Sequence, residues 1–258
     1  MRLYIKAISR YKGDLEDVDV KKELKKTYKL DTRRQDRFIH LALWGAKRVQ
    51  DRCEVNIDDE LYITSGVGNM DIVQKSNEYV KIQKEILRPF DFINMLGNTT
   101  SYYVAKALEI QGKNLFQISN SFTFIHSLIS IYASLSISKK EALLGCVDLV
   151  PEPPELIKRV LGLDKDVKVL SGVNYQKLSL NAEGAIAIIE FDTKIYRLQE
   201  VEKIAKESRL KVMFSPEDEY FETMPSYYIN AAIEAKEELL YIDSFEDKYK
   251  IIRVLKVT

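Results

Sequence analysis

Apolar positions recur along this chain in two spacings, one typical of strands and one typical of helices. An alternating run at residues 2–9 and short unbroken apolar runs further on are typical of strands in a covered sheet. We expect these further strands at 60–66, 115–119, 142–147, 184–191, 210–214, 239–245 and 249–257. Helical spacing predicts helices at 34–49, 72–87, 100–110, 122–137, 201–208 and 227–238. The alternation predicts an α/β protein whose sheets are covered by helices.

The composition is that of an ordinary globular protein. Of the 258 residues 46% are hydrophobic, and Lys plus Arg equals Asp plus Glu at 39 each, so no net charge favours nucleic acid. Residues 114–138 carry no formal charge, but 12 of these 25 are Asn, Gln, Ser, Thr or His, too polar for a lipid-facing span. The two cysteines form no disulfide framework, and the N-terminus lacks the pattern of a secretory signal. We expect a soluble cytoplasmic protein with no nucleic-acid or membrane partner.

Several short motifs, each weak alone, follow one another between residues 33 and 191. They are Arg33-Arg34-Gln35-Asp36-Arg37-Phe38, Ile63-Thr64-Ser65-Gly66-Val67-Gly68, Arg88-Pro89-Phe90, Gly112 with Asn114, Gly145-Cys146-Val147-Asp148 and Glu183-Gly184-Ala185. Their order and spacing resemble the β-ketoacyl synthases of the thiolase superfamily. The resemblance implies a thiolase-like layered α/β/α/β/α sandwich. Residues 1–192 would form a ketosynthase-like N-terminal half and residues 193–258 a shortened C-terminal half of the same sandwich.

The resemblance places Ser121 where the family carries its acyl-bearing cysteine. It also implies that the neighbours Asn120, Phe122 and Thr123 bind substrate. The family draws two imidazoles from its second half, but this chain has two histidines and neither follows residue 126. A serine without an adjacent base is a poor nucleophile. The simpler interpretation is that Ser121, or Asn120 beside it, is the N-cap of the helix at 122–137, because both residue types are favoured there.

The other candidate residues favour structural roles. We interpret His126 as a core histidine whose polar atoms are satisfied, His40 as a surface residue and Cys146 as a small apolar filler in a buried strand. The acidic groups Asp58-Asp59-Glu60 and Glu217-Asp218-Glu219 lie in charged, loop-like surroundings and are interpreted as surface. No cluster has the spacing of metal ligands or of a dinucleotide fingerprint, so no metal or cofactor is expected.

Residues 21–34 form a local basic cluster. It comprises Lys21, Lys22, Lys25, Lys26, Lys29, Arg33 and Arg34. One interpretation is a solvated helix face. The other is a docking patch for an acidic acyl carrier protein, whereas nucleic acid is disfavoured because few aromatic residues are interleaved with the cations.

The missing cysteine and imidazoles favour a non-catalytic ketosynthase-like subunit of fatty-acid or polyketide biosynthesis, similar to chain length factors. The resemblance implies a dimer, with itself or with an active ketosynthase, joined through the strand at 115–119, and an acyl carrier protein as a further partner. We do not expect a competent β-ketoacyl synthase. The alternative is an acyl transferase or hydrolase of altered chemistry that uses Ser121. A free-standing carrier-protein binding module is a weaker third option.

Overall fold

The structure, a computed structural model, describes residues 1–13, 18–119 and 121–257. Its strands are β1 (Arg2–Gly13), β2 (Glu60–Ser65), β3 (Asn114–Ile118), β4 (Ala142–Asp148), β5 (Lys168–Val169), β6 (Ser171–Ser179), β7 (Ala187–Phe191), β8 (Lys211–Phe214), β9 (Glu219–Tyr220), β10 (Leu239–Phe245) and β11 (Lys248–Leu255). Its helices are α1 (Val20–Lys26), α2 (Arg37–Gln50), α3 (Met70–Asn77), the π-helical η2 (Glu78–Gln83), α4 (Pro89–Met95), α5 (Gly97–Leu108), α6 (Thr123–Ser138), α7 (Glu155–Leu161), α8 (Leu198–Glu207) and α9 (Met224–Glu234).

Most strands belong to one mixed sheet. Among the described residues this sheet has nine strands in the order β3-β2-β4-β6-β1-β7-β11-β10-β8. β3, β2 and β4 run parallel at one flank, and β10 and β8 run parallel at the other. The strands between these flanks pair antiparallel. Because β1 pairs with β6 on one side and with β7 on the other, the N-terminal and C-terminal strands form a continuous sheet.

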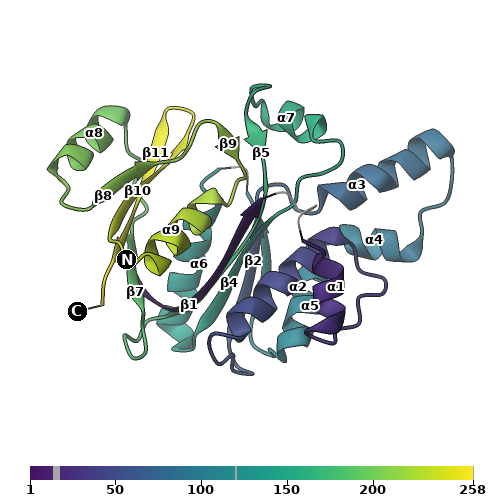
Figure 1. Cartoon of the computed structure of the whole chain (residues 1–258), viewed down its shortest axis with the longest axis horizontal. Helices are drawn as coiled ribbons and strands as arrows, with labels where there is room; N and C mark the ends of the chain where they lie inside the picture. The colour runs from purple at the N-terminus through teal and green to yellow at the C-terminus, as the bar shows by residue number, and fades with distance from the viewer. Residues whose placement is uncertain (14–17, 120, 258) are drawn as a thin grey trace.

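Helices cover the outer faces of both flanks and also fill the space between them. α1, α2 and α5 pack with β2, β4 and β6 in one core, and α8 packs with β10 and β11 in another. α6 and α9 share a central core with strands of both flanks, and Figure 1 shows these two helices between the flanks. With the two flanks of this continuous sheet as the two sheet layers, the expected order of helix, sheet, helix, sheet, helix is confirmed.

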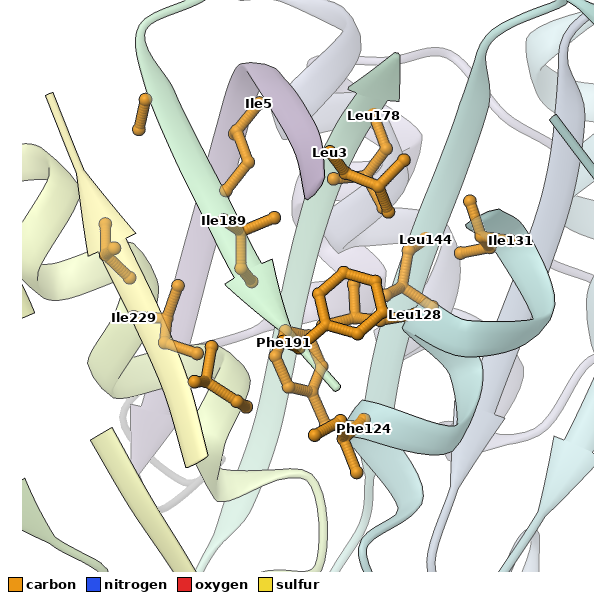
Figure 2. Packing of buried hydrophobic residues seen from close by; sticks show 14 of the residues in the cluster. Leu3, Ile5, Phe124, Leu128, Ile131, Leu144, Leu178, Ile189, Phe191 and Ile229 are labelled. Carbon is orange, nitrogen blue, oxygen red and sulfur yellow. The ribbon is translucent and has the colours of Figure 1, made fainter. Parts of the chain in front are cut away.

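The central core is built around the apolar face of α6. Phe124, Leu128 and Ile131 point from α6 towards Leu144 of β4 and Phe191 of β7, as Figure 2 shows. Each such side chain contributes about 1.5–3 kcal/mol when fully buried. Ser127, Ser130 and Ser136 of α6 turn back on their own helix, where their hydroxyl groups donate to carbonyls four residues earlier. Among the described residues, no helix has the length and apolar character needed to cross a membrane.

The central strand β6 is absent from the elements that the apolar pattern predicts. Its nine residues are all buried although several are polar. Gln176 donates to Asn230 of α9 at 2.7 Å, and Lys177, 1% exposed, forms an ion pair with Asp59. The interpretation of the acidic group around Asp59 as surface was therefore wrong for Asp59 and Glu60, which are 2% and 3% exposed. Polar partners elsewhere in the fold allow a polar sequence to form a buried strand.

The N-terminal start of α2 also differs from the expected helix. α2 begins at Arg37, because Asp36 is its N-cap and accepts a hydrogen bond from the Ile39 N–H at 3.0 Å. His40 was expected on the surface, but it is 6% exposed, and its Nε2 lies 3.2 Å from the Thr32 carbonyl oxygen. Burial lowers the pKa of His40 below its ordinary value. The single helix expected at 72–87 is divided into α3 and η2.

The strand β3 lies at the edge of the sheet. Within the described residues it pairs with β2 alone, and Leu115 and Ile118, which point to opposite faces of this edge strand, are 40% and 55% exposed. Its interpretation as a strand in a covered sheet was therefore wrong for the isolated chain. The division at residue 192 stays a prediction, because β7, which precedes it, lies between β1 and the C-terminal β11.

Candidate functional site

The chain turns sharply between β3 and α6, at the position where the sequence predicts a degenerate nucleophile. Phe122 is the N-cap of α6 and has a left-handed backbone, with φ of 50° and ψ of 32°. Such a conformation costs about 1–3 kcal/mol for a residue other than glycine. Ser121 precedes the cap, so its expected role as the N-cap was wrong. Asn120, the alternative cap and a predicted substrate-binding residue, lies outside the described residues.

Thr123, the first residue of α6, connects this turn to the C-terminal part of the chain. Its hydroxyl oxygen lies within hydrogen-bond distance of the Ser119 carbonyl oxygen and 3.0 Å from Glu222 Oε1. Glu222 also accepts a hydrogen bond from the Tyr220 hydroxyl. Thr123 is fully buried and Phe122 is 5% exposed. Their assignment as substrate-binding residues stays a prediction.

A second carboxylate, Asp148, fastens the same region. It ends β4 and accepts hydrogen bonds from the Ser65 hydroxyl and the Gly66 N–H, both at 2.9 Å. It also accepts from the Thr223 N–H at 2.8 Å and the Thr223 hydroxyl at 2.7 Å. Asp148 therefore ties the end of β2 to the segment that begins α9.

A cleft of about 370 Å³ opens beside Phe122. Its apolar walls include Phe122, Leu163, Val167, Phe221, Met224 and Phe245. Among the described residues that line it, every charged side chain is a carboxylate: Asp164, Glu217, Glu219, Glu222 and Asp243. The group at 217–219 was interpreted as surface, but Glu219 is half-buried and pairs with Lys12. The C-terminal part of the chain thus presents carboxylates to the turn before α6.

Two of these carboxyls have strongly altered acidity. Burial, reinforced by the negative charge of Asp148, raises the pKa of Glu222 to about 7. Burial and the charge of Glu222 raise the pKa of Asp243 to about 7 as well, against a hydrogen bond from Ser215. The pKa values of both carboxyls therefore lie near neutral pH.

The histidines and cysteines stand apart from this chemistry. Neither His126 nor His40 is among the described residues that line the cleft, and His126 packs edge-on against the Phe122 ring at 6.4 Å between centroids. The satisfied state of His126 stays a prediction, whereas Cys146 is confirmed as a buried filler, 1% exposed. Burial raises the pKa of its thiol far above the ordinary range, which disfavours a thiolate. The described residues contain no group of three or more His, Cys, Asp or Glu arranged to hold a metal.

A larger cavity, of about 790 Å³, lies between α1, α2 and α3. Its lining carries charges of both signs, and Arg37 pairs there with Asp71 and Glu152. None of its lining residues belongs to the turn before α6. We assign the candidate site to the smaller cleft, because that cleft contains the altered carboxyls and the strained Phe122.

Sequence patterns could have indicated only part of this site. Asp243 directly follows four apolar residues of β10, which is a usable signal for a buried functional or structural carboxyl. Glu222 gives no local signal, since its partner Thr123 lies 99 residues away in sequence.

Comparisons with known proteins identify the fold to which this geometry belongs. No protein-family model matches the chain, and no curated protein sequence matches it. A solved structure described as the ishigamide ketosynthase/chain length factor matches with a TM-score of 0.76 and 11% identity, covering 100% of this chain and 99% of that chain. A β-ketoacyl synthase from Burkholderia phymatum STM815 matches with a TM-score of 0.67 and 9% identity, covering 100% of both chains.

A further match is the structure of a ketosynthase in complex with its chain length factor from Xenorhabdus doucetiae. Its TM-score is 0.60 at 10% identity, and the match covers 86% of this chain and 79% of that chain. Identities this low show the fold alone. The chain therefore has the thiolase-like fold of ketosynthases and chain length factors. The turn before its central helix α6 and the cleft beside that turn lie within this layered sandwich.

Proposed function

We propose that this chain is a non-catalytic ketosynthase-like subunit that pairs with an active ketosynthase in fatty-acid or polyketide biosynthesis. The observation that carries the proposal is the chemistry of the cleft beside Phe122. Among the described residues that line it there is neither a cysteine nor a histidine, and its charged groups are carboxylates. Condensation in this fold requires an acyl-bearing thiolate and imidazoles, so the cleft lacks the groups that the reaction uses.

The edge strand β3 supports pairing with a second subunit. An unpaired edge exposes backbone donors and acceptors, and here it also exposes the side chains of Leu115 and Ile118. Next to it, α4 and the turn after it leave Phe90, Phe92, Ile93 and Leu96 41% to 54% exposed. A partner strand added to β3 would cover both features. Structures with the same fold include a ketosynthase with its chain length factor.

The pairing is tested by co-expression with a full-length ketosynthase from the same source and by measuring the mass of the purified complex in light scattering. Leu115→Lys should abolish the complex, because it places a charge at a 40% exposed apolar position of the strand that the partner would pair with. Phe116 is a poorer position for this charged substitution, because its ring packs against the Phe38 ring inside the subunit, with 6.3 Å between the ring centroids. Ile195→Lys, at a 53% exposed position on the C-terminal part, is the matched control and should leave the complex intact. A monomeric wild-type chain in the presence of the ketosynthase would refute the proposal.

An acyl carrier protein is a second partner that the surface supports. Lys21, Lys22, Lys25 and Lys26 of α1 are exposed, and within the described residues none of them forms an ion pair. Acidic partners are recognised by such unpaired cations. Lys22→Glu with Lys26→Glu should weaken binding of acyl carrier protein at low salt, and the exposed Lys203→Glu should not.

The alternative function is an acyl transferase or hydrolase that uses Ser121. It is favoured by one observation: Phe122, and not Ser121, is the N-cap, so the Ser121 hydroxyl is not committed to capping α6. Against it, Glu222 hydrogen-bonds Thr123 and Tyr220, and within the described residues no hydrogen bond joins it to Ser121. Incubation with acyl-CoA and measurement of intact mass decides between the functions: an adduct on Ser121 favours the transferase, and an unchanged mass favours the non-catalytic subunit.

A further inference from the structure

The cavity of about 790 Å³ between α1, α2 and α3 takes no part in the proposed function. Its volume lies within the range of about 300–1,000 Å³ that is usual for small-molecule sites. Figure 1 shows these three helices on the side of the molecule away from α8 and β8. The apolar part of the cavity wall comes from Val18, Val20, Leu41 and Ile72. The cavity can therefore accept a ligand with an apolar body.

Negative charge outweighs positive charge in the lining of this cavity. Among the described lining residues the carboxylates are Asp19, Asp36, Asp71, Glu78 and Glu152, and the cations are Lys21, Arg37 and Lys75. Arg37 is shared between Asp71, at 3.4 Å, and Glu152. Within the described residues no cation pairs with Asp36, which accepts hydrogen bonds from the Ile39 N–H and from Asn69. A further positive charge beside Asp36 and Asp71 would therefore be favourable.

The acidity of Asp36 and Asp71 reflects this shortage of cations. Burial raises the pKa of Asp36, and the charge of Asp71 adds to the rise, against the hydrogen bonds that Asp36 accepts. Burial also raises the pKa of Asp71, although the charge of Arg37 opposes that rise. A cation bound beside the two carboxyls would favour their ionised forms.

Acceptor oxygens without donors gather in the segments that border the cavity. Among the described residues, a buried side-chain oxygen accepts no hydrogen bond in each of Gln35, Asn69, Gln74, Asp91 and Asn94. Gln35 and Gln74 line the cavity itself. The amide orientation of Asn69, which is 7% exposed, is fixed, because its Nδ2 group donates to Asp36 at 2.6 Å. Buried acceptors without a partner cost free energy, so these atoms favour a ligand that supplies hydrogen-bond donors.

We propose that this cavity binds a small organic amine with an apolar body. The ammonium group lies beside Asp36 and Asp71. Its N–H groups donate to the side-chain oxygens of Gln35 and Gln74, which can turn towards the cavity because neither oxygen has a partner to lose. The described residues include no group of three or more His, Cys, Asp or Glu arranged to hold a metal, which favours an organic cation. The site goes beyond the proposed function, because none of its lining residues belongs to β3 or to the cleft beside Phe122.

Three probes with the same carbon chain separate the contribution of charge from that of hydrogen bonding. 1,6-Diaminohexane carries ammonium groups with N–H donors, hexamethonium carries the same charge without N–H donors, and 1,6-hexanediol carries donors without charge. Isothermal titration calorimetry on the full chain measures the affinity for each probe. The diamine should bind saturably and about ten-fold more tightly than either of the other two, because only the diamine makes charge-assisted hydrogen bonds. Equal binding of hexamethonium, or no saturable binding of the diamine at millimolar concentrations, would overturn the proposal.

Substitutions in the lining locate the bound amine. Asp71→Asn removes a negative charge and should weaken binding of 1,6-diaminohexane about ten-fold. Gln74→Met keeps the length of the side chain but removes the acceptor, and should weaken binding several-fold. Glu155→Gln is the matched control and should leave the affinity unchanged, because Glu155 is exposed and lies outside the lining. Thermal unfolding checks that each variant is folded, and Gln74→Met keeps the test decisive if Asp71→Asn is not. Full affinity in the folded lining variants would place the amine elsewhere and overturn the assignment.

Discussion

Opposite ends of the same parallel strands bury carboxylates in contrasting ways. At the N-terminal ends of β2 and β4, Asp59 and Glu141 both contact the buried ammonium of Lys177. At the C-terminal ends of these strands, Glu222 and Asp243 share a cleft whose charged lining, within the described residues, contains no cation. The first arrangement neutralises charge by pairing, and the second can do so only by binding protons.

The acidity of the two groups follows from this difference. Burial alone would raise the pKa of Glu141, but hydrogen bonding from Lys6 and the charge of Lys177 outweigh burial and hold that pKa below its ordinary value. At Glu222 and Asp243 hydrogen bonds oppose burial without a cation, and the pKa values still rise to about 7. At Asp59, the other partner of Lys177, burial outweighs the cation and raises the pKa, so the neighbouring cations offset burial in full only at Glu141.

The largest expected effect comes from removing the cation. Lys177→Met should lower the free energy of unfolding by about 3–5 kcal/mol, because it leaves buried carboxylates uncompensated. Urea denaturation measures this loss. Lys211→Met is the matched control: Lys211 pairs with Glu237 at the surface at 2.6 Å, and its loss should change the free energy by about 1 kcal/mol or less. Equal losses of unfolding free energy in the two variants would show that the buried ion pair contributes no more to stability than the surface pair.

The pH dependence of stability sharpens the other side of the comparison. Glu222 and Asp243 bind protons more tightly in the folded chain than their ordinary values of 4.5 and 3.8 allow. Their contribution to stability is therefore complete below about pH 4 and is lost as the pH rises through about 7. We expect a decrease of about 1–3 kcal/mol per group, measured by denaturation at a series of pH values. The double variant Glu222→Gln, Asp243→Asn should lose this decrease, and an unchanged profile would contradict the assignment.

The smallest expected effects on stability distinguish the hydroxyl of Thr123 from that of Ser121. Thr123→Val removes a buried hydroxyl with two partners and should reduce the free energy of unfolding by about 1–1.5 kcal/mol. Ser121→Ala should change it by about 0.5 kcal/mol or less, because Ser121 is not the cap. Thermal unfolding of the two variants makes the measurement. A larger loss for Ser121→Ala would restore a structural role for that hydroxyl.

The fold was largely predictable from sequence, because its signals are local. β4 and β10 are apolar runs, and Leu144, Leu239 and Leu240 are fully buried or nearly so. β6 was not predictable in this way: its Lys177 and Gln176 are compatible with a buried strand only because Asp59 and Asn230 reach them from distant parts of the chain. The polar residues of β6 indicated an exposed segment, but their partners from distant parts of the chain allow this strand to be buried.

The sequence predicted the turn before α6 but not the chemistry beside it. The motifs around Gly112 and Asn114 place a turn at Ser121, and a cleft lined by the next residue, Phe122, opens beside that turn, whereas the role of Ser121 stays a prediction. The carboxyls of Glu222 and Asp243 acquire their altered acidity from burial and from the negative charges of Asp148 and Glu222, respectively, which only the folded chain brings together. The left-handed Phe122 was likewise unpredictable, since a bulky aromatic residue has no preference for that conformation.

Turnover by the purified chain tests the central claim most directly. The chain is incubated with acyl and malonyl carrier proteins, and both condensation and decarboxylation of the malonyl group are measured alongside an active ketosynthase. Because the described residues that line the cleft include neither a cysteine nor a histidine, we expect neither product above the rate without protein. Turnover that disappears in the Ser121→Ala variant would contradict the account and identify this chain as an enzyme.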